Sequence, residues 1–329
     1  MAQDHRDRYL STYYFHGQDL CIVPRHVRED VEWMADHHVD GVFVGVHDAD
    51  LRGSNIGMIC DTVREAGLDV WLIPSRLGGL VAGWGRQPSY LAVDHPGWLG
   101  RKPDGSPRRS HGPQVSVFHP DVPEAMAETV AEMLDAFPAT GIVWDELKTL
   151  GGEDHSEAAI DALGHPANTE DMIEGTVECF SSVNRHLKKW RDKLRIACFV
   201  YGNTPQHAVE RCASIDLLDE FGCDGKCFRP GESGAGEGTT DKVLLGGNDA
   251  RFAGAARENG CLPFTLLETQ LLDEDAMELT MSYLPEFLTR KTGHLVYYYY
   301  PYGLADPERF MPAIGKALAN WRLGAGGQQ

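Results

Sequence analysis

Acidic residues end three of the apolar runs in this sequence. Trp144 directly precedes two adjacent acids, Asp145 and Glu146, and two later runs end at Glu220 and Glu268. An apolar setting makes a carboxylate costly unless it is paired or faces a pocket, and partial burial raises its pKa toward the range of a general acid. Two such acids suit the cleavage of a glycosidic bond, because one protonates the leaving oxygen while the other attacks the sugar or activates water.

Structural roles compete with this interpretation. Asp145 or Glu146 could form an ion pair with Lys148 or Arg76, and Glu268 could belong to the acid-rich first turn of a following helix. The pattern nevertheless favours Glu146, Glu268 and Asp145 as the catalytic residues.

Short apolar runs alternate with amphipathic stretches along the whole chain. This alternation predicts eight strand–helix units, and hence parallel strands. The expected strands cover 10–15, 41–47, 69–74, 141–145, 195–201, about 214–220, 262–268 and 293–299. The expected helices cover 25–38, 54–66, 121–137, 168–191, a short stretch after 204, 248–259, 274–289 and 306–321.

A closed (βα)8 barrel accounts for eight such units better than an open doubly wound sheet does. No glycine-rich phosphate turn follows the first expected strand, and no Gly-x-x-x-x-Gly-Lys-Ser/Thr loop occurs. We therefore expect one α/β barrel over 1–322 and a flexible tail over 323–329, with a long loop after the third strand and an insertion after the fourth.

Barrel enzymes carry their active sites at the C-terminal ends of the strands. Residues at these ends or in the adjoining loops are candidates for substrate contacts, and the aromatic ones could stack on sugar rings. The candidates are His47, Asp48, Arg76, Trp84, Trp98, His119, Lys148, Tyr201, Glu220 and Tyr300.

The placement of the acids resembles that of the large retaining clan of barrel glycoside hydrolases. That clan has an acid/base glutamate after strand four, preceded by asparagine, and a nucleophilic glutamate after strand seven. Glu146 and Glu268 match these two positions, while Asp145 stands where the clan has asparagine. The resemblance implies that Glu146 is the acid/base and Glu268 the nucleophile.

A run of motifs resembles the α-galactosidase-like barrels and uncharacterised glycosyl-hydrolase-like families. These motifs are His-Pro-Gly-Trp at 95–98, Lys-Pro-Asp-Gly-Ser-Pro at 102–107 and Val-Phe-His-Pro-Asp-Val-Pro-Glu at 117–124. In the α-galactosidase-like enzymes a strand-four aspartate is the nucleophile and a strand-six aspartate is the acid. That mapping implies Asp145 as nucleophile and Asp219 or Asp224 as acid.

Composition excludes several classes of function. A net charge of −19 argues against binding to nucleic-acid phosphates. No apolar run is long enough to cross a bilayer, and the first residues lack the apolar core of a secretory signal, so we expect a cytoplasmic enzyme of carbohydrate metabolism. The eight cysteines show no zinc-knuckle spacing, and neither a metal nor a cofactor is expected. The oligomeric state stays open, with a homodimer as one option.

Two other functions remain open at this point. A metal-dependent sugar isomerase or epimerase could hold a divalent cation with Glu146, Glu220, Glu268 and a histidine. A non-catalytic carbohydrate-binding barrel could use the same mouth. Amidohydrolase chemistry is disfavoured because no His-x-His follows the first strand.

Overall fold

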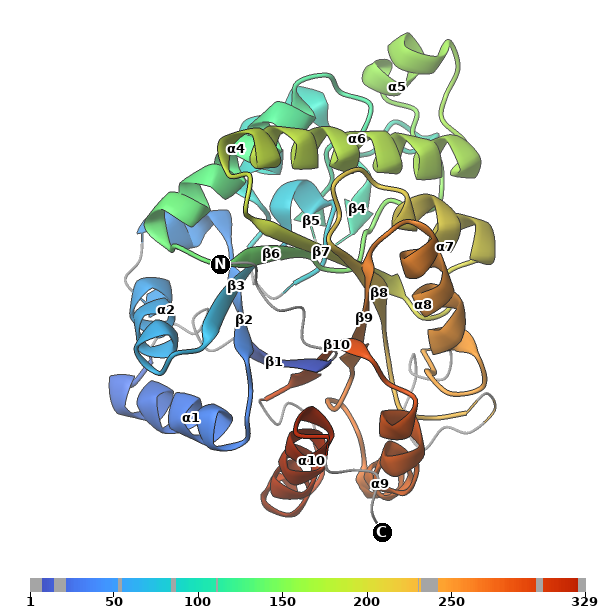
Figure 1. Ribbon diagram of the computed structural model, residues 1–329. Helices are drawn as coiled ribbons and strands as arrows, with labels where there is room; N and C mark the ends of the chain where they lie inside the picture. The colour runs from blue at the N-terminus through green and yellow to red at the C-terminus, as the bar shows by residue number, and fades with distance from the viewer. Residues whose placement is uncertain are drawn as a thin grey trace.

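Eight parallel strands close into a single barrel in the computed structural model (Figure 1). Their order around the barrel is β1-β10-β9-β8-β7-β6-β3-β2, which confirms the expected α/β fold class. The strands are β1 Arg8–Tyr14, β2 Gly41–Val46, β3 Asp69–Pro74, β6 Gly141–Trp144, β7 Arg195–Tyr201, β8 Glu220–Gly225, β9 Leu262–Leu267 and β10 Gly293–Tyr298. The structure describes residues 8–14, 22–52, 55–83, 87–110, 112–229, 231, 242–299 and 304–324.

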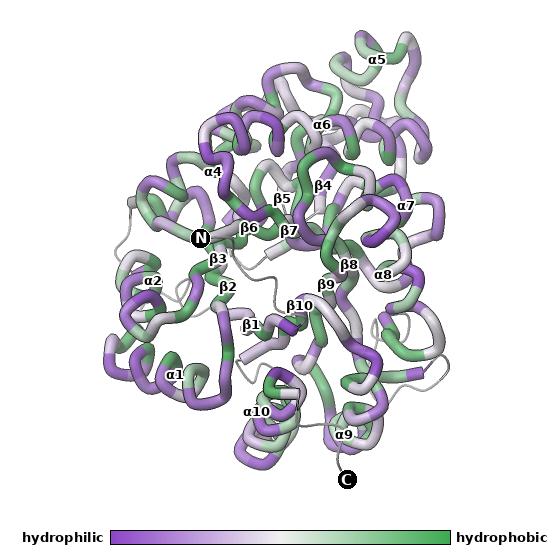
Figure 2. The backbone as a smooth tube through the Cα atoms, in the orientation of Figure 1, coloured by the Kyte–Doolittle hydropathy of each residue, from purple (hydrophilic) through white to green (hydrophobic). Residues whose placement is uncertain are grey.

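Helices surround the barrel on the outside (Figure 1). The helices that follow the barrel strands are α1 Pro24–Asp36, α2 Asn55–Glu65, α4 Val122–Ala136, α6 Thr169–Trp190, α7 Gln206–Ala213, α8 Asn248–Glu258, α9 Glu274–Thr289 and α10 Pro307–Arg322. They carry hydrophilic and hydrophobic residues in alternation, as Figure 2 shows, because each has one face on the barrel and one in water. None of those in the described ranges is long and apolar enough to cross a membrane.

Two insertions interrupt the simple alternation. The predicted long loop after β3 contains α3 Tyr90–Asp94 and a small antiparallel pair, β4 Arg109–Ser110 and β5 Gly112–Pro113, together with the 3-10 turns Leu77–Gly79 and Pro96–Trp98. A further 3-10 turn, Asp48–Arg52, follows β2. The predicted insertion after β6 contains α5 Glu157–Leu163.

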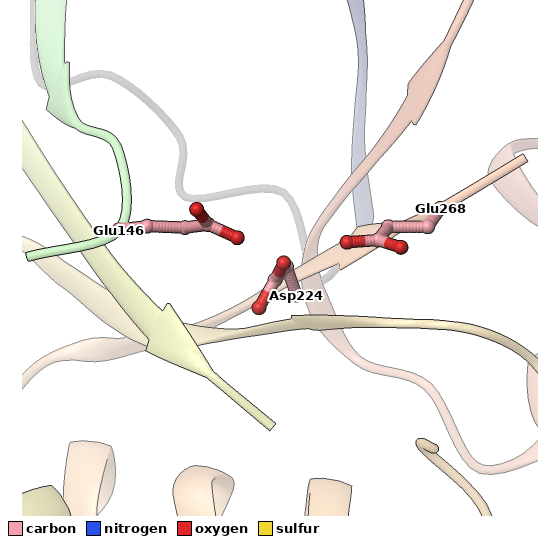
Figure 3. A group of neighbouring side chains, drawn as sticks. All are labelled: Glu146, Asp224 and Glu268. Atoms are coloured by element: carbon pink, nitrogen blue, oxygen red, sulfur yellow. The ribbon is translucent and has the colours of Figure 1, made fainter. Parts of the chain in front are cut away.

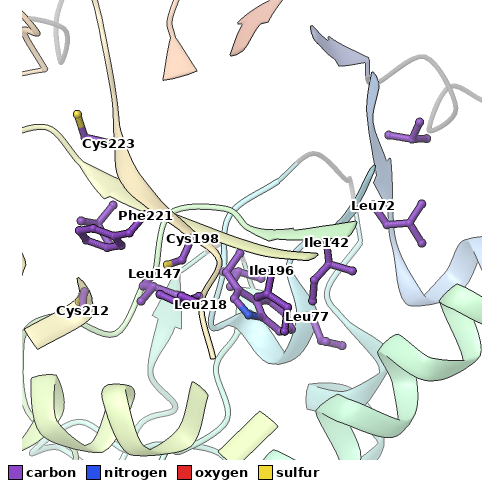
Figure 4. Packing of buried hydrophobic residues seen from close by; sticks show 14 of the residues in the cluster. Leu72, Leu77, Ile142, Leu147, Ile196, Cys198, Cys212, Leu218, Phe221 and Cys223 are labelled. Atoms are coloured by element: carbon purple, nitrogen blue, oxygen red, sulfur yellow. The ribbon is translucent and has the colours of Figure 1, made fainter. Parts of the chain in front are cut away.

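Strand alternation divides the apolar side chains into two cores. The smaller core fills the barrel interior and is rich in rings, among them Tyr13, Phe43, Trp71 and Phe199. The larger core lies between the barrel and the helices, and Figure 4 shows part of it around β6, β7 and β8. Trp144 belongs to this outer core, where its indole donates to Asn184 of α6 at 2.9 Å.

The sixth barrel strand was predicted wrongly at about 214–220, because β8 runs from Glu220 to Gly225. Its alternate positions Glu220, Gly222 and Asp224 share one face, and none of them adds to the apolar interior core. No residue with a side chain fits at position 222, because a Cβ there would lie 1.7 Å from the carbonyl oxygen of Phe264. A strand with two acids and a glycine on its inner face lacks the apolar alternation by which strands are recognised.

Glu220 consequently stands at the opposite end of the barrel from its predicted place among the substrate contacts. It begins β8, is fully buried, and pairs with Arg195 of β7 and with His294 Nδ1 of β10 at 2.5 Å. His294 Nε2 in turn lies 2.8 Å from Ser11 Oγ. This network joins β1, β7, β8 and β10 and is a structural element of the fold.

The buried pairs predict how stability depends on pH. Burial alone would raise the pKa of Glu220, but His294 and Arg195 outweigh it and lower the pKa below its ordinary value. The carboxylate therefore stabilises the fold above the unfolded-state pKa of about 4.3, and the contribution is lost as pH falls through the lower folded-state value. We expect Glu220→Gln to reduce the free energy of unfolding at pH 7 by about 3 kcal/mol.

Urea denaturation of wild type and of Glu220→Gln at several pH values measures the contribution of Glu220 to stability. The difference in free energy of unfolding between wild type and Glu220→Gln should shrink below about pH 4, because the carboxylate is protonated first in the unfolded state and, at lower pH, in the folded state. Glu258→Gln on the exposed end of α8 is the matched control and should leave stability within about 0.5 kcal/mol of wild type. A constant difference down to pH 2 would contradict the ionic role of Glu220.

Candidate active site

Three acids from three different strands meet at the C-terminal end of the barrel. Asp145 continues the inward alternation of Val143, Asp224 that of Gly222, and Glu268 that of Leu266. All three acids are buried. The barrel thus brings together groups that lie far apart in the sequence.

Glu146 joins this group through an unusual backbone conformation. In a regular strand its side chain would point away from that of Asp145. Its φ of 39° lies in the left-handed region, which costs an ordinary residue about 1–2 kcal/mol. The turn aims both neighbouring acids at the same site, and strained residues of this kind concentrate at functional sites.

Lys242 connects three of the acids. Its Nζ donates to Glu146 Oε1 at 2.7 Å, to Asp224 Oδ2 at 2.9 Å and to Glu268 Oε1 at 3.0 Å. Figure 3 shows the three carboxyl groups pointing toward one another, and one oxygen of each lies within 4.8 Å of the others. Among the described residues this is the group that could hold a metal ion, and the ammonium of Lys242 lies between its members.

Lys148 and Tyr201, both predicted as substrate contacts, lie beside this group. Lys148 Nζ donates to Glu146 Oε2 at 2.5 Å and also to the Tyr201 hydroxyl. The Tyr201 ring lies under both ammonium groups, 4.2 Å from Lys148 Nζ and 4.1 Å from Lys242 Nζ. Such cation–π contacts stabilise the positive charge inside the mouth.

The acids differ in protonation although they are close neighbours. Burial and the adjacent Glu146 charge raise the pKa of Asp145 to about 8. Burial opposes the ionisation of Glu146 as well, but its hydrogen bond with Asp224 and the charges of Lys242 and Lys148 lower its pKa to about 2. At neutral pH Asp145 is therefore largely neutral and Glu146 is ionised.

Asp224 carries a second proton in this group. Burial, followed by the Glu146 charge, raises its pKa well above the ordinary value. Its Oδ1 is buried and meets no donor within the described part of the chain. A protonated Asp224 that donates to Glu146 explains both observations, because a carboxylic acid supplies its own donor.

The predicted contacts on the loops after β2 and β3 have structural partners. His47 Nδ1 lies 2.9 Å from Asp48 Oδ1, and Asp48 Oδ2 accepts from the Ser89 hydroxyl at 2.6 Å. Burial raises the pKa of Asp48, but the bonds from His47 and Ser89 outweigh it and the net pKa is lowered. Arg76, with a left-handed φ of 57°, approaches the Gly83 carbonyl at 3.5 Å. The Ser89 bond ties the long loop to the turn after β2, and the Arg76 contact lies within the long loop.

Trp98 and His119 form a separate aromatic stack. The Trp98 ring lies between His95, at 3.8 Å, and His119, at 4.8 Å. His119 lines a hollow of about 480 Å³ together with Phe118 and residues of α5. No contact in the described ranges joins this stack to the acids. Trp84 and Tyr300, the remaining predicted contacts, lie outside the described residues.

Sequence reasoning missed Lys242 altogether and considered Asp224 only through the α-galactosidase-like mapping. Asp219, the other aspartate of that mapping, lies before β8 and binds Lys188 at 2.9 Å. Lys242 follows the glycine-rich stretch and precedes no recognisable element, so no pattern marks it. A correct boundary for strand six would have revealed Asp224.

Known proteins similar to this chain were found by comparison of structures and not by comparison of sequences. It resembles an α-galactosidase from Lactobacillus brevis with a TM-score of 0.58 and 11% identity, over 98% of this chain and 41% of that one. It resembles the catalytic domain of a β-amylase from Paenibacillus polymyxa with a TM-score of 0.62 and 11% identity, over 95% and 98%. It resembles a β-galactosidase from Marinomonas ef1 with a TM-score of 0.60 and 12% identity, over 96% of this chain and 59% of that one.

These neighbours are glycoside hydrolases, and the chain shares their (βα)8 barrel fold. The chain spans about two fifths of the length of the α-galactosidase. No protein-family description and no curated protein sequence matches it. At these identities the likeness shows the fold.

The strained backbone at Glu146 gives a testable consequence. Glu146→Gly and Glu146→Ala remove the same carboxylate, but only glycine adopts a positive φ without steric cost. We expect the glycine variant to have the higher free energy of unfolding, by about 1 kcal/mol. Chemical denaturation of the two variants measures the difference.

The matched control is the same pair of substitutions at Glu128, an exposed residue inside α4. There the order should reverse, with glycine less stable than alanine by about 1 kcal/mol, because helices disfavour glycine. If alanine is also the more stable at position 146, the strain does not exist.

Proposed function

We propose that this protein is a glycoside hydrolase whose active site is the group of acids at the mouth of the barrel. One observation carries the proposal: buried acids from three barrel strands converge there with different protonation. Glycosidic cleavage needs one neutral and one ionised carboxyl group on either side of the bond. The glycosidases with the same barrel fold support the general class.

Asp145 is the best candidate for the proton donor. Its pKa of about 8 keeps it protonated at neutral pH, and it is buried next to the ionised Glu146. This assignment differs from the mapping that makes Glu146 the acid, since two ammonium groups hold Glu146 in its ionised form.

Glu268 is the best candidate for the nucleophile or base. Glu146 binds lysines through both of its oxygens, whereas Glu268 binds Lys242 through Oε1. Glu146 then acts as the fixed negative charge that keeps a proton on Asp145 and holds Lys148 in place. A sugar ring could contact Tyr201 and Lys148 beside the acids.

Substitution of the acids tests these roles on a panel of aryl and alkyl glycosides. Glu146→Gln and Glu268→Gln should each lower kcat/KM by about 100-fold or more, because each removes a charge that acts in the transition state. Full activity in both variants would refute the assignment of these acids as the active site. Azide should restore turnover in Glu268→Ala if that residue is the nucleophile, since the small anion can enter the vacated space.

The proton donor has a distinct signature. Asp145→Asn should lose most activity on alkyl glycosides, whose leaving groups need protonation, but little on dinitrophenyl glycosides, which leave without a proton. Equal losses on both substrate types would contradict the role of Asp145 as acid.

The pH dependence follows from the same residue. Because the pKa of Asp145 is raised to about 8, its acid form is present below that pH and lost above it, so kcat/KM on alkyl glycosides should fall as pH rises through about 8. Burial is the largest cause of this raised pKa, and the charged groups that act on Asp145 are Glu146, Lys148, Lys242 and Glu268.

Measured pH–rate profiles of wild type and Asp145→Asn on the dinitrophenyl substrate provide the comparison. Neither protein should show the alkaline limb on this substrate, because its leaving group needs no proton, whereas wild type should show it on alkyl glycosides. An alkaline limb near pH 8 that persists in Asp145→Asn would assign that limb to another group.

A further inference from the structure

Lys242 is anchored so that its ammonium reaches the centre of the acid group. Its carbonyl accepts from Lys226 N at 2.7 Å, and Leu244 N donates to the Lys226 carbonyl at 2.9 Å. The short segment around Val243 thereby pairs in parallel with the chain just after β8. The position of Lys242 is fixed by backbone hydrogen bonds as well as by charge.

The ammonium group and the acids match one another in number. A lysine ammonium has three N–H donors and no acceptor. The three distances of 2.7, 2.9 and 3.0 Å give each donor one carboxyl oxygen, from the ends of β6, β8 and β9. The Tyr201 ring covers a further side of the same group. The three oxygens surround the ammonium group much as oxygen ligands surround a bound metal cation.

The positive charge of Lys242 lowers the cost of holding these acids close together. Their oxygens lie within 4.8 Å of each other, and the side chains of Asp224 and Glu268 are 1% and 8% exposed, so water screens them little. Lys148 cannot replace Lys242, because among these acids its only hydrogen bond in the described structure is to Glu146.

We propose that Lys242 is a tethered cation: its ammonium occupies the place that a divalent metal would take among Glu146, Asp224 and Glu268, and it positions these acids for the reaction. The catalytic part of this inference rests on the proposed glycosidase function. The part that concerns the cation does not, since it depends only on the contacts of the ammonium.

Removal of the lysine should expose a metal site. Oxygen ligands suit Mn²⁺, so Lys242→Ala should bind one Mn²⁺ per chain in calorimetry and in electron paramagnetic resonance. Wild type should bind none at the concentrations that saturate the variant. Lys148→Ala is the matched control and should also bind none. The double variant Lys242→Ala with Glu268→Gln should lose the site again.

Activity provides a second measurement on the same proteins. Lys242→Ala should lower kcat/KM by about 100-fold, and added methylammonium should raise it again in a saturable way, because the free cation fits where the tethered one was. Lys242→Arg should retain intermediate activity, since a planar guanidinium keeps the charge but cannot direct three donors as an ammonium does. Methylammonium should not affect wild type.

The outcomes separate the two proposals. If Lys242→Ala binds Mn²⁺ while wild type cleaves no glycoside on the panel, the tethered cation stands and the proposed function falls. If wild type is active but Lys242→Ala neither binds Mn²⁺ nor responds to methylammonium, the tethered cation is refuted. Should Lys242→Ala fail to fold, Lys242→Met keeps the apolar contact with Tyr201 and undergoes the same measurements.

Discussion

The attraction between the Lys242 ammonium and three converging carboxyl groups is the interaction on which the site depends. Two like charges about 4 Å apart repel by about 4 kcal/mol at the effective dielectric of a protein surface. Two features offset this repulsion. Lys148 and Lys242 bind Glu146, and the pKa values of Asp145 and Asp224 are raised so that these acids keep their protons. The proposed chemistry uses the result, a neutral acid beside an ionised one.

The barrel supplies the geometry that this balance needs. Its interior is packed with aromatic and aliphatic side chains, and two of them, Val143 and Leu266, stand two residues before Asp145 and Glu268 on the same strands. β8 is the exception, with Glu220 and Asp224 at its two ends and Gly222 between them. One end takes part in a structural network with Arg195 and the other in the candidate active site. An acidic side chain therefore stabilises the fold at one end of β8, and another stands in the candidate active site at the other end.

The sequence alone was sufficient to predict the architecture and to single out most of the acids of the candidate site. Alternating apolar runs and amphipathic stretches are local patterns, and local patterns suffice to predict eight units and hence a barrel. The doublet Asp145-Glu146 and the acid Glu268 were recognisable because each directly ends an apolar strand. The bounds of β8 were predicted wrongly because its inner face is not apolar, and Glu220 was consequently placed at the wrong end of the strand.

Only the tertiary structure decided which groups act on one another. Lys242 carries no local signal, and its role arises because backbone pairing beside β8 brings it to acids from three strands. The protonation of Asp145 and Glu146 was likewise beyond the sequence, since adjacent acids of the same kind acquire opposite states through burial and through distant lysines. Periodicity predicts where most side chains of a regular strand point, but charge interactions depend on distances across the whole fold.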